Sequence, residues 1–516
     1  MNKIQLRALL LSFFVCCLAQ FSLAQEREMA LDNFFSTINR NGDISGSLLV
    51  AENGKVLYKR SFGYADAQNK IPNSENTLFQ IASVSKLFTA IAVLQLYESK
   101  KLDITDKFIK YFPDFPYPDV TIKQILSNTS GIPDVGDVFV PIWKLHQDTV
   151  FTLQDIIPSL KLQKLPVDFK SGDYWEYSNT NYSLLALLVE KISGEKYANY
   201  LSKKIFIPAG MRNTFQKTSG TNPYPHPNLA YNYAWPFISS LAPARVDSFA
   251  TNDYKVHYRT WPAEGDANIY TSVSDLINFD QALYKGRLLK QKTLGLVFSP
   301  STRNNGKKII LHGVASEIGV IGDFYWGFGN RIDVDSTLGK IVWESGGLPG
   351  CRANMIQNLT KHQLLIWLDN KESPSAMDNL FGALNIANGR TVAIKKAKQQ
   401  AAPLYARSLI TEGEDVAFAK LMTMVSDTTT NYNLSESNLN DLGYEFFSDQ
   451  KTDLALQTFR AAVYVFPNSD NLFNSYGEIL AKSGKKEAAI IMYKRSLLLN
   501  PKNDDSKKAL EQLEQK

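Results

Sequence analysis

Cysteine is nearly absent from this chain. There are three cysteines in 516 residues, and Cys16 and Cys17 lie in an N-terminal segment that we expect to be removed. The residues before Cys16, Phe-Phe-Val, lack the small side chains expected before a lipidated cysteine, which disfavours a lipoprotein. Cys351 then remains alone, so the mature chain can form no internal disulfide and depends on its hydrophobic core. We expect Cys351 to be buried and inert rather than nucleophilic.

Long hydrophobic runs are also absent after the N-terminus. No later segment reaches the roughly 20 uncharged apolar residues that a membrane-spanning helix needs. The N-terminus has a basic start at Lys3 and Arg7, an apolar run over residues 8–19, and a small-residue pattern at 22–24 before Gln25. This arrangement is typical of a secretory signal peptide. We predict a signal peptide over residues 1–25 and export to a bacterial periplasm or the extracellular space.

Clusters of metal ligands and of like charge are missing as well. The histidines are scattered, without the paired spacing of a metal site; they are His146, His226, His257, His312 and His362. The net charge is +5 with both signs interspersed, which gives no reason to expect nucleic-acid binding. We therefore predict neither a metal nor any other cofactor.

A serine and a lysine stand at the head of a strongly apolar stretch. Ser83 and Lys86 are three residues apart, so they share one face if a helix begins near Ser83. The residues after Lys86 are apolar almost all round, which is typical of a helix inside a core. Burial there would lower the pKa of the lysine and make it a base for the serine hydroxyl. The same spacing recurs in polar or glycine-bearing turns at Ser193/Lys196, Ser448/Lys451 and Ser483/Lys486.

A tyrosine and an asparagine supply a candidate proton relay. Tyr177 and Asn179 follow the loop around Gly172 and precede an apolar helical stretch. The phenol can pass protons and the amide can orient Lys86. The second copy of this pattern, Tyr197-Ala198-Asn199, lies within a predicted helix and has no turn to present it. We therefore favour Tyr177.

The pattern of strands and helices predicts a mixed α+β fold of the α/β type. Strands are expected at residues 46–51 and 56–62, joined across an Asn-Gly hairpin turn. Further strands are expected near the other end, at 308–311, 340–343, 352–357 and 364–369. Helices are expected at 26–38, 102–112 and 182–192, from Ser375, and as a short helix within 120–133 that is stopped by Gly131 and Pro133. This order indicates an antiparallel sheet closed by its own terminal segments, flanked by helices and a helical subdomain. The aromatic loop at 216–262 is either a binding wall or packing for the body of the domain.

The C-terminal region carries an internal repeat. Four pairs of residues are each 34 apart: Gly443/Gly477, Ala455/Ala489, Phe459/Tyr493 and Pro467/Pro501. This period and these residue types indicate tetratricopeptide repeats, which are all helical. A helix at 409–425 and a cap at 507–513 would extend the two copies, and residues 393–404 are a candidate linker. We expect domains at 26–392, 393–435 (linker and extra helix) and 436–516.

Three motifs in chain order resemble those of a known family. They are Ser83-Val84-Ser85-Lys86, Tyr177-Ser178-Asn179 and the stretch from Trp343 to Gly350, W-E-S-G-G-L-P-G. The chain resembles the serine β-lactamase-related hydrolases, which include class C β-lactamases, D-alanyl-D-alanine carboxypeptidases and esterases. Residues 126–133 also look like the family's stretch after its first helix, and the resemblance covers about residues 28–390.

The resemblance assigns a role to each matching position. It implies that Ser83 is the acylated nucleophile and that Lys86 and Tyr177 are base and relay. Asn179 would hold the lysine and the substrate amide. The backbone N–H groups of Ser83 and Gly347 would form the oxyanion hole, and Ser345 and Gly346 would lie along the substrate.

Glu344 departs from the family pattern. Family members usually have Lys or His at this position, and that cation is understood to meet a substrate carboxylate. A carboxylate here would repel such a substrate and would raise the pKa of a nearby Lys86. Alternatively, Glu344 points away or pairs with an arginine such as Arg352. The change favours a neutral ester, or an amide whose leaving side is uncharged or cationic.

Several functions remain as alternatives at this point. The first is an exported serine hydrolase acting on a small-molecule or peptide substrate. The others are a hydrolase fold that has lost turnover and serves as a binding protein, and a penicillin-binding carboxypeptidase or β-lactamase. A purely structural protein would not explain the polar residues at matched positions. The repeats suggest a peptide or protein partner, but they could also brace the first domain or form a dimer surface.

Overall fold

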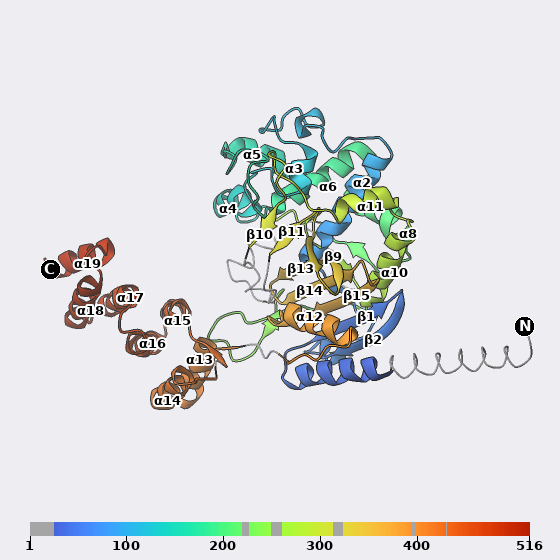
Figure 1. Cartoon of the computed structure of the whole chain (residues 1–516). Helices are drawn as coiled ribbons and strands as arrows, with labels where there is room; N and C mark the ends of the chain where they lie inside the picture. Colours follow the sequence, from blue (N-terminus) through green and yellow to red (C-terminus); the bar gives the residue numbers. More distant parts are fainter. Residues whose placement is uncertain are drawn as a thin grey trace, which may run out of the picture. The chain divides into compact units, whose positions relative to one another are not determined.

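The computed structural model describes residues 25–218, 226–248, 261–312, 323–394, 398–429 and 431–515 (Figure 1). The predicted signal peptide lies outside these residues, except for Gln25. The contacts divide the chain into two units. The first comprises Met1–Ala234 and Arg245–Lys395, and the second comprises Trp235–Ala244 and Lys396–Lys516. No helix of the described residues has the length and apolarity required to cross a membrane.

The first unit is built on an eight-stranded antiparallel sheet with the order β10-β11-β12-β13-β14-β15-β1-β2. The strands are β1 (Gly46–Glu52), β2 (Lys55–Phe62), β10 (Ile310–Leu311), β11 (Phe324–Trp326), β12 (Arg331–Asp335), β13 (Gly339–Leu348), β14 (Cys351–Asn358) and β15 (Gln363–Asp369). β15 pairs with β1, with Leu49 opposite Ile366. The predicted closure of the sheet by its terminal segments is therefore confirmed.

Helices cover both faces of this sheet (Figure 1). On one face, residues 25–40 are helical and pack with α12 (Ala376–Ala387), where Phe35 stacks on Tyr58 at 5.3 Å between ring centroids. On the other face lie α2 (Ser85–Glu98), α10 (Val273–Tyr284) and α11 (Gln291–Val297). Cys351 is buried in β14, and burial raises the pKa of its thiol to about 12, as expected for an inert thiol.

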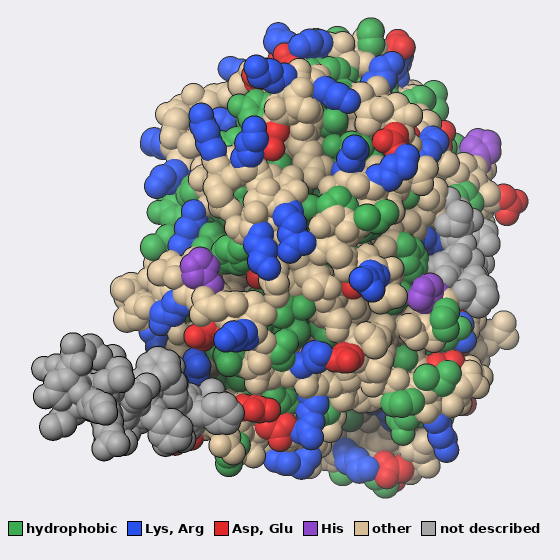
Figure 2. Space-filling model, turned by 90° about the vertical axis from the view of Figure 1, so that its right-hand side faces the viewer, with side chains coloured by type: hydrophobic (Ala, Val, Ile, Leu, Met, Phe, Trp, Pro, Cys, Tyr) green, Lys and Arg blue, Asp and Glu red, His purple; other side chains and the backbone are tan. Residues whose placement is uncertain are grey.

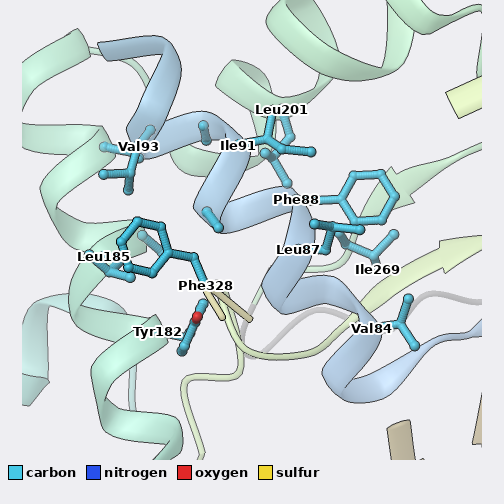
Figure 3. Close-up of a cluster of buried hydrophobic side chains, with 14 of the residues drawn as sticks. Val84, Leu87, Phe88, Ile91, Val93, Tyr182, Leu185, Leu201, Ile269 and Phe328 are labelled. Carbon is cyan, nitrogen blue, oxygen red and sulfur yellow. The ribbon is translucent and has the colours of Figure 1, made fainter. Parts of the chain in front are cut away.

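α2 runs through the core because its apolar residues occupy every side. Leu87, Phe88, Ile91 and Val93 are all buried, and Figure 3 shows their side chains leaving the helix in different directions. The helix is enclosed by neighbours that include Tyr182 and Leu185 of α6 (Asn179–Ser193), Leu201, Ile269 and Phe328. A helix that is apolar all round must be buried in this way.

A helical subdomain follows α2 along the chain. It contains α3 (Ile122–Leu126), α4 (Val135–Leu145), α5 (Ile156–Gln163), α6 (Asn179–Ser193), α7 (Tyr197–Leu201) and α8 (Ile207–Ala209), with short helical turns η2 (Phe108–Lys110), η3 (Leu153–Asp155) and η4 (Ser202–Phe206). The predicted helix at 102–112 is wrong, since only η2 is helical there. The Asp103 carboxylate accepts from the Thr105 N–H and the Asp106 carboxylate accepts from the Asp103 N–H, and such local bonds compete with a helix.

Short strands complete the first unit. β5 (Phe79–Gln80), β9 (Ile269–Thr271) and β6 (Phe215–Gln216) form a three-stranded sheet, and β3 (Tyr64–Asp66) pairs with β4 (Ile71–Pro72). The aromatic loop is described in part and contains β7 (Tyr233–Ala234) and β8 (Ala244–Arg245).

In Figure 2, lysine and arginine side chains are spread over the visible face with acidic ones between them.

The second unit is mostly helical, and its helices repeat with the period of the sequence. They are α13 (Ala401–Glu412), α14 (Glu414–Val425), α15 (Glu436–Ser448), α16 (Thr452–Val465), α17 (Asp470–Lys482), α18 (Lys486–Leu499) and α19 (Asp504–Glu514), with the short strands β16 (Gln399–Gln400) and β17 (Tyr432–Asn433). α15, α17 and α19 begin at positions 34 apart, as do α16 and α18. The expected single helix at 409–425 is instead the pair α13 and α14, and the expected linker overlaps the start of α13.

Glycine allows the helices of each repeat to pack closely. A Cβ on Gly443 would lie 2.5 Å from the Phe459 ring, and one on Gly477 would lie 3.0 Å from the Tyr493 ring. Both distances are shorter than ordinary packing contacts. The periodic glycine and the periodic aromatic residue are therefore two halves of one helix–helix contact.

Candidate active site

Ser83 lies in a short helical turn immediately before α2. This turn, η1, spans Ala82–Val84, and α2 begins at Ser85. Our prediction of a helix starting near Ser83 is therefore correct to within two residues, but Ser83 itself is in 3-10 geometry. Ala82 has φ +42°, in the left-handed region that non-glycine residues rarely adopt. This strained residue turns the chain so that Ser83 precedes the helix.

Lys86 is fully buried and has three hydrogen-bond partners. Its Nζ lies 3.0 Å from Ser83 Oγ, 2.8 Å from Asn179 Oδ1 and 3.2 Å from the carbonyl oxygen of Asp266. The amide and carbonyl oxygens can only accept, so they hold two N–H groups of the lysine. The third position on Nζ faces Ser83 Oγ. It carries a proton when the lysine is an ammonium and a lone pair when the lysine is neutral.

The orientation of Asn179 is set by the partly buried carboxylate of Asp134. Its Nδ2 donates to Asp134 Oδ2 at 3.2 Å, so its Oδ1 must face Lys86. Asp134 Oδ1 also accepts from the backbone N–H groups of Asn179 and Thr180. These are first-turn donors of α6, where a carboxylate is favourable. Asp134 thereby couples the start of α6 to the position of the lysine.

Tyr177 contacts the serine from the other side. Its hydroxyl donates to Ser83 Oγ at 2.8 Å, and its ring lies 4.8 Å from Lys86 Nζ. Trp326 packs edge-on against the ring at 6.0 Å between centroids and holds the phenol in place. Ser83, Lys86, Tyr177 and Asn179 are thus brought together, although they come from separate segments of the chain.

The charges around Lys86 oppose our expectation of a depressed lysine pKa. Burial lowers the pKa of Lys86, but Tyr177, Asp266 and Glu344 raise it, and the net pKa lies above the ordinary value for lysine. Burial and Glu344 also raise the pKa of Tyr177, against the lowering effect of Lys86. The resting site therefore contains an ammonium and a neutral phenol. The prediction that burial deprotonates Lys86 is wrong, because Tyr177, Asp266 and Glu344 together outweigh burial, and of these only Glu344 was anticipated from the sequence.

β13 presents an open edge beside η1. It pairs with β12 only up to Trp343, so residues 344–348 have no strand partner on that side among the described residues. A Cβ on Gly346 would lie 2.8 Å from Ser83 N and 2.4 Å from Ile81 O, so only glycine permits this approach. Gly347 is exposed and Ser345 half-buried. The open edge lies next to the nucleophile, where an extended substrate can pair with it.

Glu344 faces the site and is paired with Arg331 rather than Arg352. Its Oε1 accepts from Arg331 Nη1 at 2.7 Å, while Arg352 lies nearest Glu372 at 3.8 Å. Glu344 is 2% exposed, and burial raises its pKa although Arg331 lowers it. Because Glu344 acts on the pKa of both Lys86 and Tyr177, it belongs to the site. Our suggestion of Arg352 as the partner is wrong.

Sequence reasoning missed three residues of this site: Asp134, Asp266 and Arg331. Asp134 follows directly after the Gly-Ile-Pro turn at 131–133, a position that suits a helix cap. Asp266 lies in a buried loop, and the sequence around it shows no pattern that predicts a functional residue. Arg331 opens the alternating strand R-I-D-V-D, which is a strand signal with an inward-facing charge. No group of three or more metal-binding side chains occurs in the described ranges.

A serine hydroxyl held between a lysine and a tyrosine, beside an open strand edge, is the arrangement of an acyl-enzyme serine hydrolase. The chain belongs to the β-lactamase family, because the family model described as Beta-lactamase matches residues 31–351. It acts as a serine hydrolase on amide or ester substrates.

Named relatives agree with this assignment. The chain is 32% identical to Penicillin-binding protein 4* of Bacillus subtilis (strain 168) over 480 residues, which cover 91% of this chain and 99% of the relative. Among solved structures, a penicillin-binding protein from Bacillus halodurans has TM-score 0.54 at 24% identity, covering 68% of this chain and 98% of that one. A D-amino acid amidase from Ochrobactrum anthropi has TM-score 0.54 at 21% identity, covering 71% and 98%. These two structures share the fold.

Proposed function

We propose that the protein is an exported serine hydrolase in which Ser83 is acylated, Lys86 and Tyr177 move its proton, and Asn179 positions the lysine and the substrate amide. The observation that carries this proposal is the position of Ser83 Oγ, 2.8 Å from Tyr177 Oη and 3.0 Å from Lys86 Nζ. Few structural roles require a serine with two such partners at the mouth of a buried helix. The arrangement is that of a nucleophile with a base.

The reaction follows from these contacts. The reactive form is the one in which the Lys86–Tyr177 pair has first released one proton to solvent. In that form Ser83 Oγ attacks the substrate carbonyl carbon, and its proton passes to the pair. The backbone N–H groups of Ser83 and Gly347 receive the negative charge that develops on the carbonyl oxygen. The carbonyl–leaving-group bond then breaks as the pair returns the proton to the leaving group. Water attacks the resulting ester on Ser83, releases the acid and restores the serine.

The substrate we propose is a neutral ester, or an amide whose leaving side is uncharged or cationic. Position 344 carries a carboxylate, and the nearest cation, Arg331, is already bound to it. The Arg331 guanidinium also lies 5.3 Å and 5.0 Å from the rings of Trp326 and Trp343. Arg331 is therefore paired with Glu344 and is not free to bind a substrate carboxylate along Ser345 and Gly346.

Comparative hydrolysis tests the proposed substrate class. We expect hydrolysis of short p-nitrophenyl esters and little turnover of a chromogenic cephalosporin. Efficient cephalosporin turnover would contradict the proposal. A Glu344→His variant should bind carboxylate-bearing substrates more tightly than the wild type.

A penicillin-binding carboxypeptidase or β-lactamase is the second candidate. It is favoured by the full-length match to a relative named as a penicillin-binding protein, and by Arg331, which offsets the charge of Glu344. In this case a labelled penicillin should acylate Ser83 rapidly. Labelling of Ser83 by an ester or a fluorophosphonate but not by the penicillin would exclude this candidate.

For the helical unit, we propose tetratricopeptide repeats that bind an extended peptide or protein segment. Support comes from the 34-residue period and from a segment that this unit already holds. The Glu445 carboxylate accepts from the N–H groups of Ile238 and Ser239, and Arg407 lies 3.8 Å from the Trp235 ring. A Glu445→Gln variant should weaken protection of residues 235–244 from hydrogen exchange. Unchanged protection would count against the proposal.

Export is proposed from residues 1–25. We expect the protein secreted by a bacterial host to begin at Gln25 or Glu26, directly after the small-residue pattern at 22–24. N-terminal sequencing of the secreted protein checks this, and an intact N-terminus on the secreted chain would contradict it.

A further inference from the structure

A second buried acid lies beside the lysine and is not used in the proposed reaction. Asp266 is fully buried. Its backbone carbonyl accepts from Lys86 Nζ at 3.2 Å, which fixes the residue at the lysine. Its carboxyl group contacts Ser183 of α6, one turn after Asn179, and its negative charge raises the pKa of Lys86. The backbone contact alone would not need a carboxyl side chain at this position.

The carboxyl group of Asp266 is only partly satisfied. Its Oδ1 lies 3.1 Å from the hydroxyl of Ser183, which it shares with the carbonyl oxygen of Pro262, also at 3.1 Å. Its Oδ2 is buried without a hydrogen-bond partner among the described residues. An unpaired buried carboxylate oxygen is costly unless a nearby positive charge compensates it. Lys86 is the cation that acts on this carboxyl, and Ser183 lies one helical turn after Asn179 on α6.

Opposing effects set the pKa of the Asp266 carboxyl group. Burial raises its pKa to about 7, with Asp134 adding to the rise and Lys86 opposing it. The carboxyl is therefore neutral in acid and charged in base, and its charge changes near neutrality. The titratable groups that face Lys86 are Tyr177 and Tyr182 from the α6 region, Glu344 from β13, and Asp266 itself.

We propose that Asp266 is a positioning residue whose carboxylate holds Lys86 as the ammonium between turnovers and so sets the pH at which the lysine becomes a base. The Asp266 carboxylate acts on Lys86 electrostatically, without a hydrogen bond. The Asp266 backbone carbonyl and Asn179 Oδ1 accept the two N–H groups of Lys86 that do not face Ser83. Charge at Asp266 thus controls whether the position facing Ser83 carries a proton or a lone pair. This inference rests on the proposed function, because it concerns the lysine that serves Ser83.

The pH dependence of the reaction tests this role. The Asp266→Asn variant keeps the backbone carbonyl and removes the charge, so the lysine loses its proton more readily. Because the pKa of Lys86 lies above its ordinary value, the range from about pH 5 to 10 lies on the acid-side limb of kcat/KM for p-nitrophenyl acetate. Above about pH 7, where Asp266 is charged in the wild type, we expect this limb to move about one pH unit lower in the variant, and near pH 5 the two proteins should agree. The rate of Ser83 labelling by a fluorophosphonate should likewise rise about tenfold above about pH 7.

Two further variants keep the test decisive. Ser183→Ala removes the hydroxyl that stabilises the charged form of Asp266, so it should move the limb in the same direction by a smaller amount, even if Asp266→Asn does not fold. Glu264→Gln removes a buried carboxylate two residues away and should leave the limb in place. The proposal is overturned if the limb stays unmoved in Asp266→Asn and Ser183→Ala, or moves equally in Glu264→Gln. Failure of the proposed function is a separate result, in which wild-type Ser83 is unlabelled at every pH.

Discussion

Removing Arg331 from the Arg331–Glu344 ion pair should destabilise the first unit, and removing both members should cost less than the two single changes added together. Glu344 is 2% exposed and Arg331 16%, and their nearest atoms are 2.7 Å apart. Arg331→Met keeps an apolar stem between Trp326 and Trp343 but leaves a buried carboxylate without its cation. Such a loss costs about 3 to 5 kcal/mol in buried pairs, and the partial exposure of Arg331 places our expectation at about 3 kcal/mol.

The double variant decides whether the pair itself is responsible. Glu344→Gln alone should cost less, about 1 to 2 kcal/mol, because water can reach the remaining guanidinium. In Arg331→Met/Glu344→Gln no buried charge remains, so the total should fall short of the sum by about 2 kcal/mol or more. Six of the seven tryptophans lie in the first unit, so urea unfolding followed by tryptophan fluorescence reports on it. Additive costs, within about 0.5 kcal/mol, would refute the reasoning.

Three other predictions concern the site and its support. Gly346→Ala should abolish activity, because its Cβ would lie 2.8 Å from Ser83 N, whereas Gly347→Ala meets only the end of a flexible arginine side chain and should keep most activity; kcat/KM and circular dichroism compare the two. Tyr177→Phe should lower kcat by about 10² to 10⁴ with a normal fold, as loss of a proton relay does, and an unchanged kcat would remove the tyrosine from the mechanism. Burial raises the pKa of Asp280 to about 7, so the stability it contributes is present below about pH 4 and is lost as pH rises through about 7. Asp280→Asn should remove as much as about 4 kcal/mol of that decline in pH-dependent urea unfolding, and a decline equal to that of the wild type would contradict this assignment.

Much of the fold could be predicted because local pattern and tertiary structure agree. The Asn-Gly turn between β1 and β2 has φ +52° and +73° at residues 53 and 54, the geometry that this dipeptide favours. The uninterrupted apolar stretch after Lys86 predicts a buried helix, and α2 is one. β11 and β12 were not predicted. β11 has only three residues, too few to show a pattern, whereas the alternation of β12 is a strand signal that was overlooked. The helix expected at 102–112 failed because side-chain-to-backbone bonds, invisible in a hydrophobic pattern, replaced it.

The site could be predicted in its residues but not in its charges. The spacing and order of the motifs predicted that Ser83, Lys86, Tyr177 and Asn179 form one site. The acids that govern them, Asp134 and Asp266, come from loops whose approach to Lys86 depends on the tertiary fold. The same holds for the partner of Glu344: Arg331 lies opposite Trp343 across the β12–β13 register, whereas proximity in sequence suggested Arg352. Electrostatic surroundings are set by such long-range neighbours, so the direction of the lysine pKa could not be read from burial alone.

The most direct test of the central claim is the site of covalent labelling. The protein is treated with a fluorophosphonate, digested, and the modified peptide is identified by mass spectrometry, with Ser83→Ala and Ser85→Ala as matched variants. The nucleophile proposed here predicts one adduct on Ser83, present in Ser85→Ala and lost in Ser83→Ala. An adduct on a different serine, or no adduct on folded wild-type protein, would contradict it.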